Sequence, residues 1–234
     1  MGYENLTPAL ERIKMVSGFL ASHGQETKTV FALEDHYRDT PQMTEAVNRM
    51  KADPGVGRLI SQGYTTPDYD LDEMAKYPPG SLAHTYAKLM RLAGYSAKFY
   101  PEREIKSDAD YCIMRVRKTH DLHHVVTGFS QQGPGEAGVI GVTAYQFGYP
   151  AFVLIDLAAM ALTFHRAEGF QNALDDVGRG MLMGHACKPL LAVKWEEGWE
   201  KPVARWREEL DIKPVTTGPQ SWHSLPGMQD WETA

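Results

Sequence analysis

The sequence feature that most constrains the fold is the stretch from His120 to Glu136, where ionisable side chains flank a break rich in glycine. A helix advances about 100° per residue, so His120 and His124 lie about 40° apart and share one face. Asp121 lies at the other edge of that face, about 100° from His120. Glycines and a proline within 128–135 then interrupt the helical pattern. The stretch therefore predicts two helices joined by a tight turn.

A second helix beginning near Pro134 places Glu136 in its first turn, since proline suits the first helical position and a carboxylate suits a helix N-terminus. If the two helices fold back on each other, Glu136 meets His120, Asp121 and His124. Two nitrogen and two oxygen ligands favour zinc, iron(II) or manganese over calcium or magnesium. The pattern indicates a metal site, although a His-x-x-x-His pair also occurs on helices that bind no metal.

The composition is typical of a soluble globular protein with one domain. The chain has 234 residues, 43% hydrophobic and 23% charged, which suffices for a substantial core. Its net charge of −6, without a cluster of lysines and arginines, argues against nucleic acid as a partner. Cys112 and Cys187 lie far apart in apolar surroundings and are expected to be buried free thiols in a reducing compartment.

Hydrophobic residues recur at helical spacing along most of the chain, and strong two-residue alternation is absent from the sequence. We therefore expect an all-α fold, a single-domain helical bundle. Proline, glycine and capping residues divide the pattern into expected helices over 3–22, 29–36, 43–50, 57–60, 70–74, 81–94, 108–127, 136–147, 152–164, 173–186 and 203–210. Small residues in 136–147 indicate close packing of helix backbones.

The domain is expected to span residues 1–212, followed by an extended tail over 213–234. The tail is rich in proline, glycine and threonine, and Trp222 and Trp231 are expected to dock it on the domain. No signal peptide is visible in Met1–Leu20, which has acidic residues and no long apolar core.

The longest apolar run, Ala151–Phe164, is interrupted by Asp156 and is shorter than the roughly 20 residues that span a bilayer. Any membrane contact is therefore expected from the surface. Because Phe152–Phe164 is apolar nearly all round, it is either buried in protein or lines an apolar cavity. Together with the Met- and Gly-rich helix over 173–186 it indicates a lipid cavity, while an ordinary bundle core is the alternative.

The pattern His-Asp-x-x-His, eleven residues and then Glu resembles the signature of the Coq4 family of coenzyme Q (ubiquinone) biosynthesis proteins. His120, Asp121, His124 and Glu136 meet it here with the spacing intact. The resemblance extends to about Ile212 and leaves the tail outside. Further similar landmarks follow the family's order: Tyr37–Pro41, Pro79–Leu82 with Tyr86, Arg115–Arg117, Gln146, Gly148–Pro150, Leu190–Trp199 and Arg207–Ile212.

The resemblance implies a helical protein, often a homodimer, that binds a polyprenyl quinone precursor with its isoprenoid in an apolar channel. It implies a divalent metal, zinc first and iron or manganese as alternatives, beside the precursor's head group. It also implies that the protein organises the other quinone biosynthesis proteins and replaces the carboxylate at ring carbon C1 with a hydroxyl, an oxidative decarboxylation. The expected location is cytoplasmic and peripheral to the inner membrane, or the matrix side in a eukaryote.

Four further side chains are candidates for binding the substrate. Arg115 and Arg117 precede the motif and suit a carboxylate or phosphate head group, although a solvated salt bridge explains each equally well. His84 and Tyr86 lie near the start of the helix over 81–94.

Two other functions compete with the enzymatic one. One is a non-catalytic scaffold that binds an isoprenoid and holds a structural metal. The other is an HD-type metal phosphohydrolase, in which His84 with Asp156 or Asp175 completes the His-Asp site. That function leaves the spacing of Glu136 unexplained, so it is the less favoured of the two.

Overall fold

The computed structural model describes residues 7–16, 20–21, 27–65, 67–98 and 100–232. It confirms the all-α, single-domain prediction, and the described residues contain two isolated β-bridges but no strand. The helices are α1 (Thr7–Met15), α3 (Lys28–Tyr37), α4 (Pro41–Ala52), α5 (Pro54–Gln62), α6 (Leu71–Met74), α7 (Leu82–Ala93), α8 (Asp108–Thr127), α9 (Gly133–Phe147), α10 (Pro150–Arg166), α11 (Phe170–Ala186) and α12 (Val203–Glu209). Of the helix expected over 3–22, residues 3–6, 17–19 and 22 lie outside the described residues.

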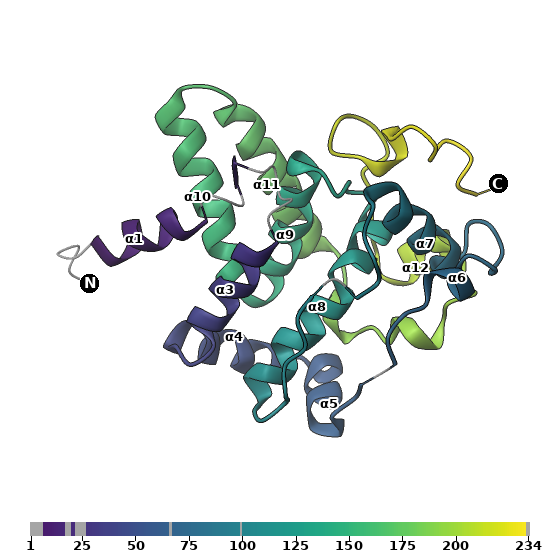
Figure 1. The fold of residues 1–234 in the computed structure, drawn as a ribbon, viewed down its shortest axis with the longest axis horizontal. Coiled ribbons are helices and arrows are strands. Elements are labelled where there is room, and N and C mark those ends of the chain that lie inside the picture. The colour runs from purple at the N-terminus through teal and green to yellow at the C-terminus, as the bar shows by residue number, and fades with distance from the viewer. Residues whose placement is uncertain (1–6, 17–19, 22–26, 66, 99, 233–234) are drawn as a thin grey trace.

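Helix α8 runs through the middle of the molecule and joins the two parts of its core (Figure 1). Its first half packs with α3, α4, α5 and α10, and its second half packs with α7, α12 and the C-terminal segment. The side chain of Ser107 accepts the N–H of Asp110 at its start, and Gly128 ends it with φ 84°. The expected bounds of this helix are confirmed.

Helices α9 and α11 pack with their backbones in direct contact, as the small residues predicted. A Cβ added at Gly180 would lie 2.0 Å from the carbonyl oxygen of Gly138, and one at Gly184 would lie 2.7 Å from that of Val142. Only glycine fits at such a separation. This contact holds the start of α9, and with it Glu136, against the rest of the fold.

Helix α10 is buried only in its first half. Its buried residues lie between Pro150 and Ala158, whereas Leu157 and Phe164 are 51% and 70% exposed. The second half of Phe152–Phe164 is thus largely exposed in the single chain, where α10 and α11 extend beyond the other helices as a hairpin (Figure 1). The alternative that this run lines an apolar cavity stays a prediction.

The C-terminal segment returns to the molecule beside α7 and α8 (Figure 1). Trp222 is completely buried and Trp231 is 7% exposed, so both tryptophans dock as predicted. Cys112 and Cys187 are free and buried, and burial raises the pKa of the Cys112 thiol to about 12 and that of the Cys187 thiol to about 11. Within the described residues, no helix combines the length and apolar character needed to cross a bilayer.

Candidate metal centre

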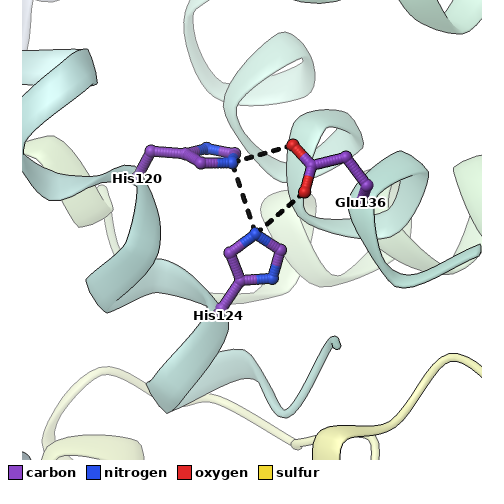
Figure 2. Close-up of side chains that lie close together, drawn as sticks. All are labelled: His120, His124 and Glu136. Carbon is purple, nitrogen blue, oxygen red and sulfur yellow. Dashed lines mark hydrogen bonds and ion pairs between the residues drawn. The ribbon is translucent and has the colours of Figure 1, made fainter. Parts of the chain in front are cut away.

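Three of the four ligand candidates meet where α8 faces the first turn of α9. Figure 2 shows the imidazoles of His120 and His124 and the carboxylate of Glu136 turned toward one another. His120 Nε2 lies 3.0 Å from Glu136 Oε1, and His124 Nε2 lies 3.2 Å from Glu136 Oε2. The two Nε2 atoms are 3.3 Å apart. All three residues offer ligand atoms within 4.8 Å of one another, which is a spacing that a single ion can bridge.

The hydrogen bond at the far side of His124 shows which of its ring nitrogens is open to a cation. His124 Nδ1 lies 3.0 Å from the carbonyl oxygen of Phe129, which can only accept, so Nδ1 carries the hydrogen. In the neutral ring, Nε2 is then an acceptor, and it faces a second acceptor on Glu136. Two acceptors at this distance require a proton or a metal ion between them. The residues therefore fit a divalent metal.

The charges in the cluster support each other. Burial alone would raise the pKa of Glu136, but the His120 and His124 imidazoles outweigh it and hold that pKa below its usual range. Burial works in the opposite sense on His120, where the Glu136 carboxylate prevails and raises the pKa. The site thus favours an ionised Glu136, which is the form that binds a metal.

The fourth candidate, Asp121, lies outside this cluster. Its Oδ1 accepts a hydrogen bond of 3.1 Å from Gln131 Nε2, and burial raises its pKa. Asp121 nevertheless lines the same pocket as His120 and Glu136. Asp121 is therefore a polar residue of the pocket wall and not part of the three-residue cluster.

The turn between the two helices is tight because of its glycines. Gly128 ends α8 with a left-handed backbone conformation, and Pro134 follows Gly133 in the first turn of α9. A Cβ at Gly135 would lie 2.2 Å from the carbonyl oxygen of Ser130. These residues bring Glu136 back over the last turns of α8, as the sequence predicted.

A pocket of about 60 Å³ opens beside the cluster, and we call it the central pocket. His120, Asp121, Gln131 and Glu136 form its polar side. Its other walls are mostly apolar and aromatic, with a buried charged pair: Thr27, Val30, Phe31, Glu34, Tyr95, Tyr100, Val116, Arg117, Ile140 and Phe152.

Arg117 is the predicted substrate-binding residue that the structure places in this pocket. Its Nε donates to Glu34 Oε2 at 2.7 Å, and its Nη1 donates to the carbonyl oxygen of Pro101 at 2.8 Å. Tyr149 donates to the other oxygen of Glu34 at 2.7 Å. Arg117 Nη2 makes no hydrogen bond with the described residues, although it lies 3.8 Å from the carboxylate oxygen Oδ1 of Asp35.

The other three candidates lie outside the lining of the central pocket. Arg115 forms a buried ion pair with Glu196 at 3.2 Å and donates to the carbonyl oxygen of Val193. His84 occupies the first turn of α7, where its backbone N–H donates to Ser81 Oγ at 3.3 Å. Tyr86 is buried against Tyr69 with ring centroids 5.8 Å apart.

A second hollow of about 340 Å³ lies on the other side of Glu136, between α9, α10 and α11, and we call it the groove. Glu136 and Ile140 line both the groove and the central pocket. Asp156 is buried in its wall, and its carboxylate oxygens have no hydrogen-bond partner among the described residues. His84, Asp156 and Asp175, the additional residues of a phosphohydrolase site, lie outside the metal-ligand cluster.

Sequence reasoning missed several pocket residues. Gln131 lies inside the motif, between His124 and Glu136. A polar side chain in the turn between two helices that carry ligands could have indicated a pocket residue. Glu34 is an acidic residue on the apolar face of α3, between Val30 and Tyr37, which is a sign of a buried pair. Phe152, whose ring centroid lies 5.4 Å from that of His120, gave no such signal.

Known proteins resemble this chain in sequence and in fold. A family model described as "Coenzyme Q (ubiquinone) biosynthesis protein Coq4" matches residues 12–216. A crystal structure from Nostoc punctiforme PCC 73102, of a protein named for ubiquinone biosynthesis, has a TM-score of 0.75 and 32% sequence identity. The match covers 88% of this chain and 97% of that one.

Curated relatives carry the same name. The mitochondrial ubiquinone biosynthesis protein COQ4 of Eremothecium gossypii is 29% identical over 179 residues, which are 74% of this chain and 55% of the relative. The mitochondrial COQ4 homolog of Rattus norvegicus is 26% identical over 172 residues, covering 71% and 64%. The chain thus matches little more than half of the length of the Eremothecium protein.

Proposed function

Because this chain belongs to the Coq4 family of coenzyme Q (ubiquinone) biosynthesis proteins, we propose that it acts in ubiquinone synthesis as a metal-dependent enzyme. Its substrate is a polyprenylated aromatic acid, and its reaction replaces the ring carboxylate at C1 with a hydroxyl. The carboxylate leaves as carbon dioxide and a water molecule supplies the hydroxyl oxygen, so the substrate loses two electrons and two protons overall; dioxygen, reduced to hydrogen peroxide, or a redox partner accepts the electrons.

The observation that carries this proposal is the cluster of two imidazoles and a carboxylate beside the central pocket. His120, His124 and Glu136 would hold the ion, with His124 kept in one tautomer by Phe129. Zinc is our first expectation, and iron or manganese are the alternatives. The bound ion would supply Lewis-acid or redox chemistry at the head group. Three protein ligands leave coordination positions open, as catalytic sites require.

The chain's own residues then bind and orient the head group. The Arg117 guanidinium suits the ring carboxylate, because a guanidinium matches a carboxylate in shape and charge and its Nη2 makes no hydrogen bond with the described residues. Glu34 holds the guanidinium in place from behind. Asp121 and Gln131 face a ring hydroxyl or carbonyl from the α8 side, while Phe152 excludes water from the cluster.

We place the isoprenoid in the groove between α9, α10 and α11. Its lining combines apolar side chains, such as Ile140 and Ile155, with polar ones, such as Asp156. Phe164, near the outer end of α10, is 70% exposed, and Leu182, in the last turns of α11, is 71% exposed. Exposed apolar side chains of this size suit a membrane surface or a partner. We therefore propose peripheral attachment to the membrane that contains the quinone pool, and a homodimer that works with other quinone biosynthesis proteins.

The test is quinone production in a cell that lacks its own homologue. His120→Ala and Glu136→Ala should each abolish production while the helix content measured by circular dichroism stays nearly unchanged. His165→Ala is the matched control, because His165 is an exposed histidine on α10. Full production by both ligand variants would refute the catalytic role.

The exposed side chains of α10 and α11 also favour a second function, a non-catalytic isoprenoid-binding scaffold. In that function the metal is structural, and variants that keep the fold keep quinone production. Arg117→Gln distinguishes the two functions in protein whose helix content matches that of the wild type, because it removes the proposed partner of the ring carboxylate without changing a metal ligand. Catalysis predicts accumulation of the carboxylated precursor, and a scaffold predicts normal conversion.

A further inference from the structure

We propose that the C-terminal segment 213–224 is a clamp that positions the metal-binding turn, with Trp222 as the positioning residue for His124. Most of this segment lies beyond the family match, which ends at residue 216. The inference rests on the proposed metal site and adds the element that shapes it. The argument starts from the hydrogen bonds at the end of α8.

A helix leaves its last carbonyl groups without intrahelical partners. At the end of α8, the His124 carbonyl accepts the Gly128 N–H at 3.0 Å, and the C-terminal part of the chain supplies further donors to this and the following carbonyls. Trp222 Nε1 donates to the carbonyl oxygen of His124 at 2.8 Å, and Val215 N donates to that of Thr127 at 2.8 Å. Arg207, just before the segment, donates from Nε to the carbonyl oxygen of Val126 at 2.8 Å. The end of the ligand helix is therefore held by the C-terminal part of the chain.

The turn after α8 is paired with the same segment on both sides of Phe129. Trp222 N donates to the carbonyl oxygen of Gly128 at 3.0 Å, and Ser130 N donates to that of Gln220 at 2.6 Å. These two bonds form an isolated antiparallel bridge between Phe129 and Ser221. Phe129 is the residue whose carbonyl accepts the hydrogen of His124 Nδ1.

The segment packs tightly against the turn. A Cβ at Gly128 would lie 2.2 Å from the carbonyl oxygen of Val215, and Trp222 is completely buried. On the other side, Gln220 Nε2 donates to Asp176 Oδ1 at 2.8 Å. Asp176 belongs to α11, which packs directly on α9. The segment therefore contacts the histidine helix and also the helix that supports Glu136.

These contacts act on His124 in two ways. They place its backbone through the Trp222 indole, and they fix the Phe129 carbonyl that selects the tautomer with Nε2 open to the ion. Groups that orient a metal ligand from behind typically change metal affinity about 10–100-fold when they are lost. Loss of the clamp should therefore weaken metal binding, whereas loss of a tail that only packs on the surface should not.

Trp222→Phe tests the clamp, because it removes the indole N–H and keeps an aromatic side chain in the core. Trp231→Phe is the matched control. Its ring packs edge to face on Trp222 at 5.1 Å, and it is likewise buried, but it lies outside the paired segment. Zinc affinity is measured by chelator competition, and the tautomer of His124 in the metal-free protein is measured by nitrogen-15 NMR of the imidazole.

We expect Trp222→Phe to weaken zinc binding about tenfold and to mix the two tautomers of His124, with less than a twofold effect for Trp231→Phe. Equal effects of the two variants, or an unchanged tautomer with unchanged affinity in Trp222→Phe, would overturn the clamp. If the wild type binds no zinc, the metal site fails, while the NMR comparison still decides the clamp.

A second variant keeps the proposal open to refutation if Trp222→Phe does not fold. Gln220→Met removes only the side-chain bond to Asp176 and leaves the backbone pairing intact. We expect it to weaken zinc binding by a smaller factor than Trp222→Phe, with the His124 tautomer retained. Affinity equal to that of the wild type would exclude a link from the segment to α11.

Discussion

Two glycines in α11 should respond in opposite directions to the same substitution. Gly178 and Gly180 are both inside the helix, two residues apart. A Cβ added at Gly178 meets nothing within 4 Å, whereas one at Gly180 would lie 2.0 Å from the carbonyl oxygen of Gly138 and 2.8 Å from its carbonyl carbon. At Gly178, alanine therefore changes only the helix propensity. At Gly180, alanine changes the helix propensity and also collides with the backbone of α9.

The magnitudes follow from these distances. Replacing an unhindered helical glycine with alanine raises the free energy of unfolding by about 0.5–1 kcal/mol, chiefly because alanine has less conformational entropy to lose on folding. At Gly180 the same gain is opposed by overpacking of about 1–3 kcal/mol, because backbone atoms of α9 cannot rotate away as a side chain would. For a chain of this size, about 2–4 °C accompanies each kcal/mol. We expect Gly178→Ala to raise the melting temperature slightly and Gly180→Ala to lower it by several degrees.

The assay is urea and thermal unfolding of the metal-free variants, followed by circular dichroism. Gly180→Ala should also weaken zinc binding, since the displaced α9 carries Glu136 two residues before Gly138. Stabilisation by both alanines would refute the direct backbone contact between α9 and α11. Destabilisation by both would refute the open space at Gly178.

Three further predictions concern buried charge, pH and metal. Glu34→Gln leaves the buried guanidinium of Arg117 without its carboxylate and should cost about 3–5 kcal/mol in chemical unfolding; a loss below about 1 kcal/mol would mean a solvated pair. Burial and the neighbouring Arg207 lower the pKa of His223 to about 4. The unfolded chain therefore binds more protons between about pH 6.5 and pH 4, stability falls as pH falls through that window, and His223→Gln should flatten the decline measured in buffered melts. Zinc at about 1,000 times its dissociation constant should stabilise the wild type by about 4 kcal/mol, and chelation should remove this gain in calorimetry.

Local signals explain why so much of the helical frame could be predicted from the sequence. Asp70, Ser81 and Ser107 each cap the helix that follows, and Gly94 and Gly128 end helices in the left-handed conformation. These effects act over a few residues, so a single sequence reveals them. The motif around His124 belongs to the same class, because its residues are joined by one turn.

Long-range pairings could not be predicted in this way. Arg117 and Arg115 look alike in sequence, but Arg117 reaches Glu34 in the central pocket, 83 positions away, while Arg115 turns to Glu196. Helical spacing placed Asp121 near the edge of the ligand face, and the structure pairs it with Gln131. Helical spacing determines the direction in which a side chain points from its own helix. Which residue it then contacts depends on how the other parts of the fold pack around that helix.

The segment after Ile212 shows the same limit. Its composition predicted an extended chain held by Trp222 and Trp231, and both rings are buried. Its backbone pairing with the turn at Phe129 depends on the position of α8, which no local pattern records. The division of the chain into a domain over 1–212 and a tail over 213–234 stays a prediction.

Elemental analysis of purified protein tests the metal centre most directly, with wild type, His124→Ala and His165→Ala prepared both with and without oxygen. The account predicts about one divalent ion per wild-type chain, retained in His165→Ala and lost in His124→Ala, because the ion is held only where the ligand set is complete. Zinc is expected. Stoichiometric iron or manganese would indicate that the oxidation takes place at the metal centre itself. A wild type without bound metal in both preparations, or equal metal in His124→Ala, would contradict the account.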